Sequence, residues 1–175
     1  MNFVRLRTYK DELYSQSMTL YKNSFPLHEQ RHSISQKEIL NHKDYHFNLI
    51  YDKTHFIGII LYWETQNFIY IEHFCIHPEM RHQKYGSQVL ELINQKGKTV
   101  ILEIDPPMDE ISKRRKTFYE KVQYQANEFK HIHPPYHKEY TGHTLVVMSY
   151  PHPLSENEYD TFYQYLRKTV MNLLD

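Results

Sequence analysis

The feature that most constrains the fold is a β-rich run that stops at a proline, after which a basic loop leads into a helix and a further strand. Residues 68–76 are rich in β-branched and aromatic side chains, and Pro78 ends the strand that they predict. Apolar residues within 89–93 then indicate one face of a helix. Residues 100–104 form a short, nearly continuous apolar run, which is typical of a buried central strand. The order strand, loop, helix, strand predicts an α/β domain.

Hydrophobic periodicity predicts the elements on either side of this unit. The runs 45–51 and 56–63, separated by a tight turn, are expected to form an antiparallel meander with residues 68–76. The other expected elements are a strand at 2–7, a helix that starts at Thr8 and ends at Pro26, a helix capped by Asp109 or Ser112, strands at 124–129 and 143–150 with a loop between them, and an amphipathic helix from Ser155 to Leu173. The predicted fold class is α/β (α+β), with a mixed, mostly antiparallel sheet of about seven strands flanked by helices.

The composition limits the class of protein. A length of 175 residues with 40% hydrophobic side chains is enough for a single domain with its own core. Lys plus Arg and Asp plus Glu both number 21, so the net charge favours neither nucleic acid nor an acidic membrane as a partner. The single cysteine, Cys75, excludes an internal disulfide, and no segment resembles a signal peptide or a membrane span. These features favour the cytoplasm.

The loop after the central strand carries a motif. Beyond Pro78 the sequence has Arg81, two residues, Lys84, one residue and Gly86. This pattern resembles the acyl-CoA-binding motif of the GNAT superfamily of N-acetyltransferases, of the small bacterial type. In that motif Arg or Gln, two residues, Gly, one residue and Gly or Ala follow a Val-x-Pro step. Lys84 replaces the first glycine, so a backbone that needs positive φ there would be strained.

The resemblance implies that this loop binds acetyl-CoA. A loop that enters a helix presents unpaired N–H groups and the positive end of the helix dipole, and both suit a pyrophosphate. By resemblance, the main chain of 83–87 holds the pyrophosphate, and the main chain near the end of the central strand binds the pantetheine arm. The residues expected to bind this cosubstrate are Phe74, Cys75, Ile76, Arg81, His82, Gln83, Lys84, Tyr85, Gly86, Ser87, Ser112 and Arg115. The alternative is an ordinary strand-to-helix turn with a solvated basic loop.

A second match lies at 112–124, which resembles the GNAT helix that ends in Phe or Leu, Tyr, Glu, Lys, Leu, Gly, Phe. Here Gln123 and Tyr124 replace the Gly-Phe pair, and Ser112 replaces the Asn that often binds the pantetheine. By resemblance, Tyr119 protonates the departing CoA thiolate, which is suitable work for a phenol held near sulfur in a dry site. The alternative is a core tyrosine on a helix face.

The attacking amine needs a proton acceptor, because a lysine-like amine with a pKa near ~10.4 is mostly protonated at neutral pH. Glu72 lies on the central strand, where several GNAT enzymes carry a catalytic glutamate, and Glu103 at the end of the adjacent strand is its competitor. Strand alternation predicts Glu72, Phe74 and Ile76 on one face and the residues between them on the other. A structural ion pair or a water relay is the third alternative.

Two further groups of residues raise other chemistry. Cys75 suggests transfer through an acyl-cysteine, but direct transfer is usual in the GNAT family and a free cysteine is most often a small buried hydrophobe. His131, His133, His137 and His143 raise the question of a metal, but no carboxylate or cysteine spacing accompanies them. We therefore expect no metal, and we place these histidines in a loop that borders the acceptor site.

The acceptor site is expected to involve Phe25, Glu29, Arg31 and Tyr136. The first three resemble a Phe-Pro-x-x-Glu-Arg-type segment of some bacterial GNAT proteins. Glu29 would hold a cationic amine and Arg31 a carboxylate or phosphate, while a capped, solvated helix junction is the alternative. The neutral charge balance offers no acidic trough for a basic protein tail, which favours a small amine.

The expected function is direct transfer of an acetyl group from acetyl-CoA to a primary amine of a small molecule. A GNAT-like domain is expected at 1–151, followed at 152–175 by a C-terminal helix that either packs on the domain or forms an interface, for example in a homodimer. A non-catalytic acyl-CoA-binding sensor or interaction module on the same fold, and a protein N-acetyltransferase, are the alternative functions.

Overall fold

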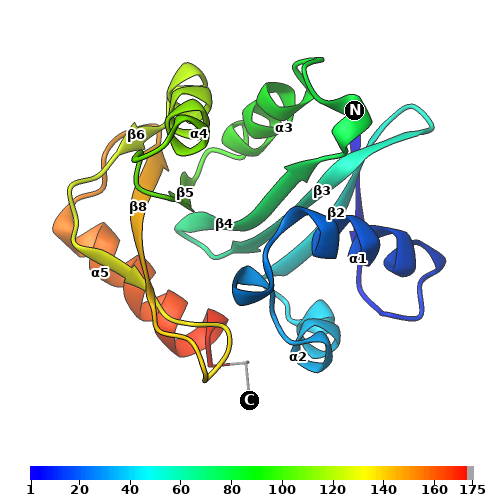
Figure 1. Ribbon diagram of the computed structural model, residues 1–175, viewed down its shortest axis with the longest axis horizontal. Coiled ribbons are helices and arrows are strands. Elements are labelled where there is room, and N and C mark those ends of the chain that lie inside the picture. The colour runs from blue at the N-terminus through cyan, green and yellow to red at the C-terminus, as the bar shows by residue number, and fades with distance from the viewer. Residues whose placement is uncertain (173–175) are drawn as a thin grey trace.

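The computed structural model describes residues 1–172, and one sheet runs through the middle of them (Figure 1). Within this part of the chain the strands are β1 (Asn2–Leu6), β2 (Tyr45–Asp52), β3 (His55–Glu64), β4 (Phe68–Ile76), β5 (Thr99–Ile104), β6 (Gln125–Ala126), β7 (His131–His133) and β8 (His143–Tyr150). Their order is β1-β2-β3-β4-β5-β8-β6, and β7 pairs with β8. Only the β4–β5 pairing among these strands is parallel. The predicted α/β class and mostly antiparallel sheet are confirmed.

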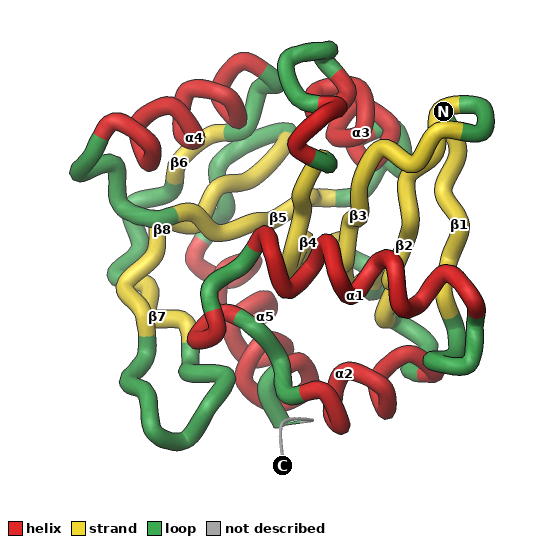
Figure 2. The backbone as a smooth tube through the Cα atoms, turned by 45° about the vertical axis from the view of Figure 1, so that its right-hand side comes forward, coloured by secondary structure: helices red, strands yellow, loops and turns green. Residues whose placement is uncertain are grey.

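Helices cover both faces of this sheet. The helices are α1 (Glu12–Ser24), α2 (Ser33–Glu38), α3 (Tyr85–Asn94), α4 (Glu110–Lys121) and α5 (Glu156–Tyr165), with short 3-10 helices at Leu27–Glu29, Ile39–Asn41 and Pro78–Met80. A π-helical segment, Leu166–Val170, continues α5. Helices α3 and α4 lie on one face, and α1, α2 and α5 lie on the other (Figures 1 and 2). The sheet therefore has an apolar core on each face.

Strand β3 shows how the sequence supplies both cores. Leu61 and Trp63 face the core under α1, α2 and α5, whereas Ile60 and Tyr62 face the core under α3 and α4. All four side chains are at most 2% exposed. A strand that is covered on both faces needs apolar residues at every position, which explains the continuous apolar run in this part of the sequence. Burial of each such side chain contributes about 1.5–3 kcal/mol.

The strands β4 and β5 diverge toward their carboxyl ends. Their parallel pairing ends at Ile71 and Leu102, although β5 stays paired with β8 to its last residue. The register between β4 and β3 shifts by one residue at the same level, which leaves Glu72 as the extra residue of a β-bulge. The second half of β4 therefore has β3 on one side and an opening on the other.

The bulge overturns the alternation that the sequence predicts for β4. Phe74 and Ile76 pack on the face of α3 and α4, whereas Glu72 bonds to Arg31 and Trp63 on the opposite face. One extra residue in a strand moves every following side chain to the other face. The prediction that Glu72 shares a face with Phe74 and Ile76 is therefore wrong.

The region between α4 and β8 differs from the prediction as well. The strand expected at 124–129 is reduced to β6, which has two residues. The segment expected to be a loop contains β7, whose residue His133 pairs with His143 at the start of β8. Three residues are too few for a clear sequence pattern, so pairing with β8 rather than local propensity decides this strand.

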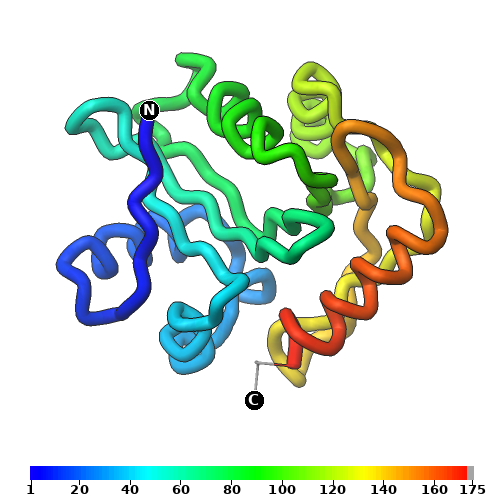
Figure 3. Tube along the Cα trace, turned by 180° about the vertical axis from the view of Figure 1, so that it is seen from behind, coloured from blue at the N-terminus to red at the C-terminus, as the bar shows by residue number. Residues whose placement is uncertain are grey.

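The apolar stripe of α5 and its continuation packs into the core of the domain. Phe162, Leu166 and Val170 are 0% exposed, and the Phe162 ring contacts Phe68 and Tyr70 of β4. Figure 3 shows α5 from behind. The hydroxyl of Tyr159 bonds to His131 of β7, and the hydroxyl of Tyr163 donates to the carbonyl of Ile132 in the same strand. Leu173, the last residue of the predicted stripe, lies outside the described residues. The described part of this helix thus packs on its own domain.

Removal of the Phe162 ring tests this packing. Phe162→Ala should lower the free energy of unfolding by about 3–5 kcal/mol, because it leaves a cavity against β4. Urea denaturation followed by the fluorescence of the single tryptophan, Trp63, measures the change. Gln164→Ala, on the exposed face of the same helix, should change it by less than about 0.5 kcal/mol. Equal losses in the two variants would contradict the packing.

Candidate active site

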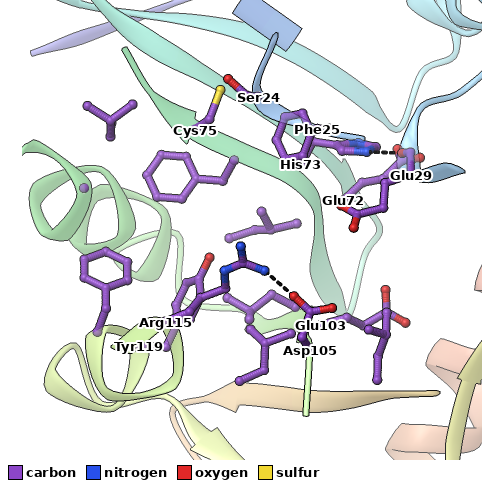
Figure 4. A pocket seen from close by; sticks show the side chains of 18 of the residues that line it. Ser24, Phe25, Glu29, Glu72, His73, Cys75, Glu103, Asp105, Arg115 and Tyr119 are labelled. Carbon is purple, nitrogen blue, oxygen red and sulfur yellow. Dashed lines mark hydrogen bonds and ion pairs between the residues drawn. The ribbon is translucent and has the colours of Figure 1, made fainter. Parts of the chain in front are cut away.

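A cavity of about 860 Å³ lies at the opening between β4 and β5 (Figure 4). The diverging strands form its floor, and α3 and α4 border one end. Residues 25–31, the segment after α1, border the other end. The predicted site residues that line it are Phe25, Glu29, Glu72, Phe74, Cys75, Ile76, Arg81, His82, Lys84, Tyr85, Gly86, Ser87, Glu103, Arg115, Tyr119 and Tyr136. Residues predicted to bind the cosubstrate, to catalyse the reaction and to bind the acceptor thus line one cavity.

The N-terminus of α3 opens onto this cavity. Its N-cap residue, Lys84, makes no side-chain hydrogen bond to the helix, and the first backbone bond of the helix runs from Gln88 N–H to Lys84 C=O. The N–H groups of the first turn therefore face the cavity end together with the positive end of the helix dipole. This arrangement is a ready anion site.

Backbone strain accompanies this helix start. Lys84 has φ of 64°, as the replacement of a motif glycine predicts, and His82 has φ of 63°. A left-handed conformation costs a residue with a side chain roughly 1–2 kcal/mol. Both of these residues line the cavity. Lys84, which stands where the motif has a glycine, also adds a positive charge beside the anion site.

Two arginines border the same end of the cavity. Arg81 folds back over the end of β4, since its Nε donates to the carbonyl of Ile76 at 3.2 Å. Arg115 of α4 pairs with Asp105 at 2.6 Å, and both side chains are about half exposed (Figure 4). The α3 end of the cavity is therefore positive, apart from the carboxylate of Asp105 beside Arg115.

Tyr119 lines the cavity from α4, next to the ring of Phe118. Burial raises the pKa of Tyr119 to about 12, so its phenol stays protonated at neutral pH. Helices α3 and α4 approach closely at this place, because a Cβ on Gly86 would lie 3.0 Å from the ring of Phe118. A larger side chain at 86 would therefore press against this ring.

Two of the predicted cosubstrate residues do not line the cavity. Ser112 is buried in a capping box at the start of α4, where its N–H and hydroxyl both bond to the side chain of Asp109. Its side chain serves the helix cap and does not line the cavity, so the geometry does not favour its predicted role with the pantetheine. The side chain of Gln83 donates to the carbonyl of Glu79 instead.

Glu72 lies in a buried network of hydrogen bonds. Its carboxylate accepts bonds from Arg31 at 2.8 Å, Trp63 Nε1 at 2.7 Å and the Tyr136 hydroxyl at 3.0 Å. Burial alone would raise the pKa of Glu72, but Arg31 and the other donors outweigh it and lower this pKa to about 2. A carboxylate with so low a pKa binds a proton poorly, so the geometry favours the third alternative, a structural ion pair.

The structure corrects the prediction that Arg31 binds the acceptor. Its side chain is 0% exposed, does not line the cavity and bonds to Glu72 and to the carbonyl of Val170. It therefore cannot meet an anionic group of the acceptor. Instead it ties the segment after α1 to β4 and to the C-terminal part of the chain. Separation along the sequence, 41 residues between Arg31 and Glu72, hides this pair from sequence patterns.

Glu103 is also held by hydrogen bonds to neighbouring side chains. Its carboxylate accepts bonds from His131 Nε2 and from the Tyr70 hydroxyl at 2.6 Å, and His133 Nε2 lies 3.7 Å away. Burial would raise the pKa of Glu103, but His133, His131 and Tyr70 outweigh this effect and lower it. The carboxylate thus stays charged beside the cavity.

The other end of the cavity is acidic and rich in histidine. Glu29 lines it, and its pKa is raised by burial and by the charge of Asp105. Phe25 and Tyr136 supply aromatic walls. His28 lines this end, and Asp105, paired with Arg115, lines the cavity too, and neither was predicted from the sequence. His133 and His143 also line this end. They were predicted to lie in a loop that borders the acceptor site, and the structure places them on β7 and β8 instead.

Cys75 lines the cavity but is poorly suited to carry an acyl group. Burial raises the pKa of its thiol to about 11, so little thiolate exists at neutral pH. Within residues 1–172 no cluster of three His, Cys, Asp or Glu has the geometry of a metal site. No helix in the same range is long and apolar enough to span a membrane.

Comparison with known proteins shows which family this domain resembles. Residues 43–126, which span β2 to β6, match the family model described as an acetyltransferase (GNAT) domain. A solved structure of a proposed GNAT-family acetyltransferase from Bacteroides thetaiotaomicron is 28% identical, with a TM-score of 0.91 over 98% of both chains. Residues 43–126 thus match a GNAT acetyltransferase domain, and the resemblance seen in the sequence is confirmed.

More distant structures share the fold. An aminoglycoside 6'-N-acetyltransferase in complex with coenzyme A is 14% identical, with a TM-score of 0.60 over 88% of this chain and 100% of that chain. The ribosomal-protein-S18-alanine N-acetyltransferase of Escherichia coli is also 14% identical, with a TM-score of 0.59 over 89% of this chain and 97% of that one. At these identities the likeness is one of fold alone. A search of curated proteins finds no significant match.

The Glu72–Arg31 pair predicts a specific pH dependence of stability. Since the pKa of Glu72 is about 2 in the fold and about 4.5 ordinarily, its contribution is present above the ordinary value and is lost as the pH falls toward 2. Glu72→Gln should lose about 3–5 kcal/mol at pH 7, because Arg31 is left buried without a counter-charge, and should lack this acid-dependent loss. Urea denaturation between pH 7 and 3 measures both effects.

Two controls belong to this experiment. Glu110→Gln removes an exposed carboxylate and should leave stability nearly unchanged. Removal of both partners, Glu72→Leu with Arg31→Met, should cost less than Glu72→Gln alone, since no uncompensated charge remains. If Glu72→Gln were as stable as the unchanged protein, the pair would not anchor the site.

Proposed function

We propose that this protein transfers an acetyl group from acetyl-CoA to a primary amine of a small molecule by direct attack. The observation that carries the proposal is the division of one cavity into an anion-binding end at α3 and an acidic, histidine-rich end at Glu29. Tyr119 and the free edge of β4 lie at the same cavity. Such an arrangement suits a cosubstrate with phosphates at one end and a cationic acceptor at the other.

The α3 end fits the phosphates of acetyl-CoA. First-turn N–H groups, Arg81 and Lys84 surround the space that a pyrophosphate would fill. Beyond it, the main chain of Phe74 to Ile76 has no β5 partner, since the parallel pairing ends at Ile71. A pantetheine arm, which carries amide groups, can bond to such an edge as an added strand does.

Tyr119 is the proposed acid of the reaction. The amine nitrogen attacks the thioester carbon, the C–S bond then breaks, and the phenol of Tyr119 gives its proton to the leaving sulfur. The raised pKa of Tyr119, about 12, keeps that proton in place until the thiolate forms. With the Cys75 thiol protonated, direct transfer is favoured over an acyl-cysteine step.

The shape and charge of the acceptor end favour a small cationic amine. Glu29 supplies negative charge, and Phe25 and Tyr136 supply apolar walls. An aminoglycoside acetyltransferase shares this fold, which supports a small acceptor, and a ribosomal-protein N-acetyltransferase shares it too, which keeps a protein acceptor as the alternative. Because acetyl-CoA is an intracellular metabolite, we place the protein in the cytoplasm.

Gly86→Glu tests the cosubstrate site. A carboxylate at the start of α3 would repel the pyrophosphate, so acetyl-CoA binding should fall at least 100-fold in isothermal calorimetry. Gly86→Gln adds nearly the same volume against Phe118 without the charge, and its binding should fall less. If neither variant weakens binding, the cosubstrate does not lie on α3. Failure of the unchanged protein to bind any acyl-CoA would overturn the proposal.

Tyr119→Phe tests catalysis apart from binding. Loss of the hydroxyl should reduce kcat by about 10²–10⁴-fold and leave acetyl-CoA affinity within threefold, because the ring still packs against Phe118. Thiol release is measured with kanamycin, spermidine, tyramine and a peptide with an N-terminal alanine. Turnover with the peptide alone would favour the protein N-acetyltransferase. Binding without turnover for every amine would favour a non-catalytic acyl-CoA sensor.

A further inference from the structure

The two candidate carboxylates leave the acceptor amine without an obvious proton acceptor. Glu72 is held by three donors, and Glu103 is held by His131 and Tyr70. His133 and His143 also line the cavity, where they face each other as a cross-strand pair between β7 and β8. His28, Glu29, His73 and Asp105 line the cavity as well, but Asp105 pairs with Arg115, His73 Nε2 bonds to the Glu29 carbonyl, and His28 lies beside the Glu29 carboxylate. His133 and His143 are therefore considered as acceptors of the amine proton.

The hydrogen bond of His133 fixes its tautomer. Its Nδ1 lies 2.6 Å from the carbonyl oxygen of Pro134. A carbonyl oxygen can only accept, so Nδ1 carries the ring proton and Nε2 carries the lone pair. Nε2 lies 3.7 Å from Glu103 Oε2, a distance too long for a hydrogen bond, so the lone pair stays available.

Glu103 gives His133 a counter-charge. Protonation of Nε2 would create an imidazolium within 4 Å of a carboxylate that is 6% exposed. Attraction between such charges is stronger in a site that excludes water than at the surface. Tyr70 and His131 bond to the same carboxylate and hold it in place. The carboxylate thus stabilises the protonated ring.

Other charged and titratable groups surround His133 from every side. It interacts electrostatically with Glu29 of the segment after α1, His73 of β4, Glu103 of β5 and His143 of β8. The ring of Tyr136 lies tilted beside it, with the two ring centroids 5.1 Å apart. Two carboxylates and two histidines thus lie around His133, and of these the carboxylate of Glu103 is the one placed within 4 Å of His133 Nε2.

We propose that His133 is the catalytic proton acceptor, with Glu103 as the positioning residue that stabilises its protonated form. This inference rests on the proposed function. The amine nitrogen forms a bond to the thioester carbon, and the electrons of the C=O bond move to oxygen. The proton on that nitrogen passes to His133 Nε2. The C–S bond then breaks, the C=O bond reforms, sulfur receives the proton of Tyr119, and both side chains exchange protons with water.

His143 is the rival, and its surroundings suit this task less well. Among the described residues its Nε2 is buried without a hydrogen-bond partner. Its pKa is lowered by burial and by the charges of His28 and His133. Its ring stacks on His28 at 4.9 Å, and among its neighbours only Asp105 favours a positive charge. A proton on His143 would therefore lie among other histidines rather than against a buried carboxylate.

Nitrogen NMR of ¹⁵N-histidine-labelled protein tests the arrangement without any acceptor. His133, assigned with His133→Asn, should show the neutral ring with its proton on Nδ1. The opposite tautomer would leave Nε2 without a free lone pair and would overturn the role of this ring.

The kinetic test uses acetyl-CoA and whichever of the four amines named above turns over fastest. The asparagine of His133→Asn can still donate to Pro134 but cannot accept the proton, so kcat should fall about 10²–10⁴-fold and the acid limb of the kcat/KM profile should vanish. The KM for acetyl-CoA should stay within threefold. Added imidazole should restore at least tenfold activity to His133→Ala, which a merely structural role would not allow.

Each result decides between the proposals. Glu103→Gln should move the acid limb to lower pH, because the counter-charge of the protonated ring is removed, and His143→Asn should keep the limb. An acid limb that survives in His133→Asn but vanishes in His143→Asn would overturn the assignment while leaving the proposed function intact. Acetyl-CoA binding without turnover by the unchanged protein would instead overturn the proposed function, and the catalytic role of His133 with it.

Discussion

The separation of β4 from β5 is the constraint on which the rest of the structure depends. A parallel pair that continued past Ile71 and Leu102 would leave no cavity and no free strand edge. The bulge at Glu72 bends β4 away at this level, and the buried pair with Arg31 anchors the bulge to the segment after α1. Burial of this ion pair limits its net contribution to the free energy of unfolding, because removal of its two charges from water is costly. Its main effect is to fix the bulge in one arrangement.

From this separation follows the distribution of charge along the cavity. The N-terminus of α3 provides a positive end without any buried cation, since helix dipoles and N–H groups need no counter-ion of their own. The opposite end gathers Glu29, Glu103 and the histidines of β7 and β8. A cosubstrate that bears phosphates and an acceptor that bears an amine would thus enter from different ends and meet near Tyr119, where the phenol is held protonated by burial.

The local parts of the site could be predicted from the sequence, and the distant contacts could not. The start of α3 and the helix with Tyr119 are encoded by neighbouring residues, so their motifs predicted both, including the positive φ at Lys84. For the start of α4, the sequence predicted Asp109 or Ser112 as the cap, and the structure shows both residues in one capping box. The sequence could not show that the side chain of Ser112 bonds to Asp109 rather than facing the cavity. Arg31, by contrast, was placed in the acceptor site because its charge was visible and its partner was not.

The sequence by itself determined the α/β class, the meander of β2, β3 and β4, the helix that presents the anion site and the helix that carries Tyr119. Each of these depends on the periodicity or spacing of residues close together in the chain. Only the tertiary structure decided which face of β4 carries Glu72, that Arg31 is its partner, and that β7 brings His133 beside Glu103. A single extra residue in a strand reverses its faces, and a three-residue strand is selected by its pairing partner, so neither leaves a periodic signal that a sequence could show.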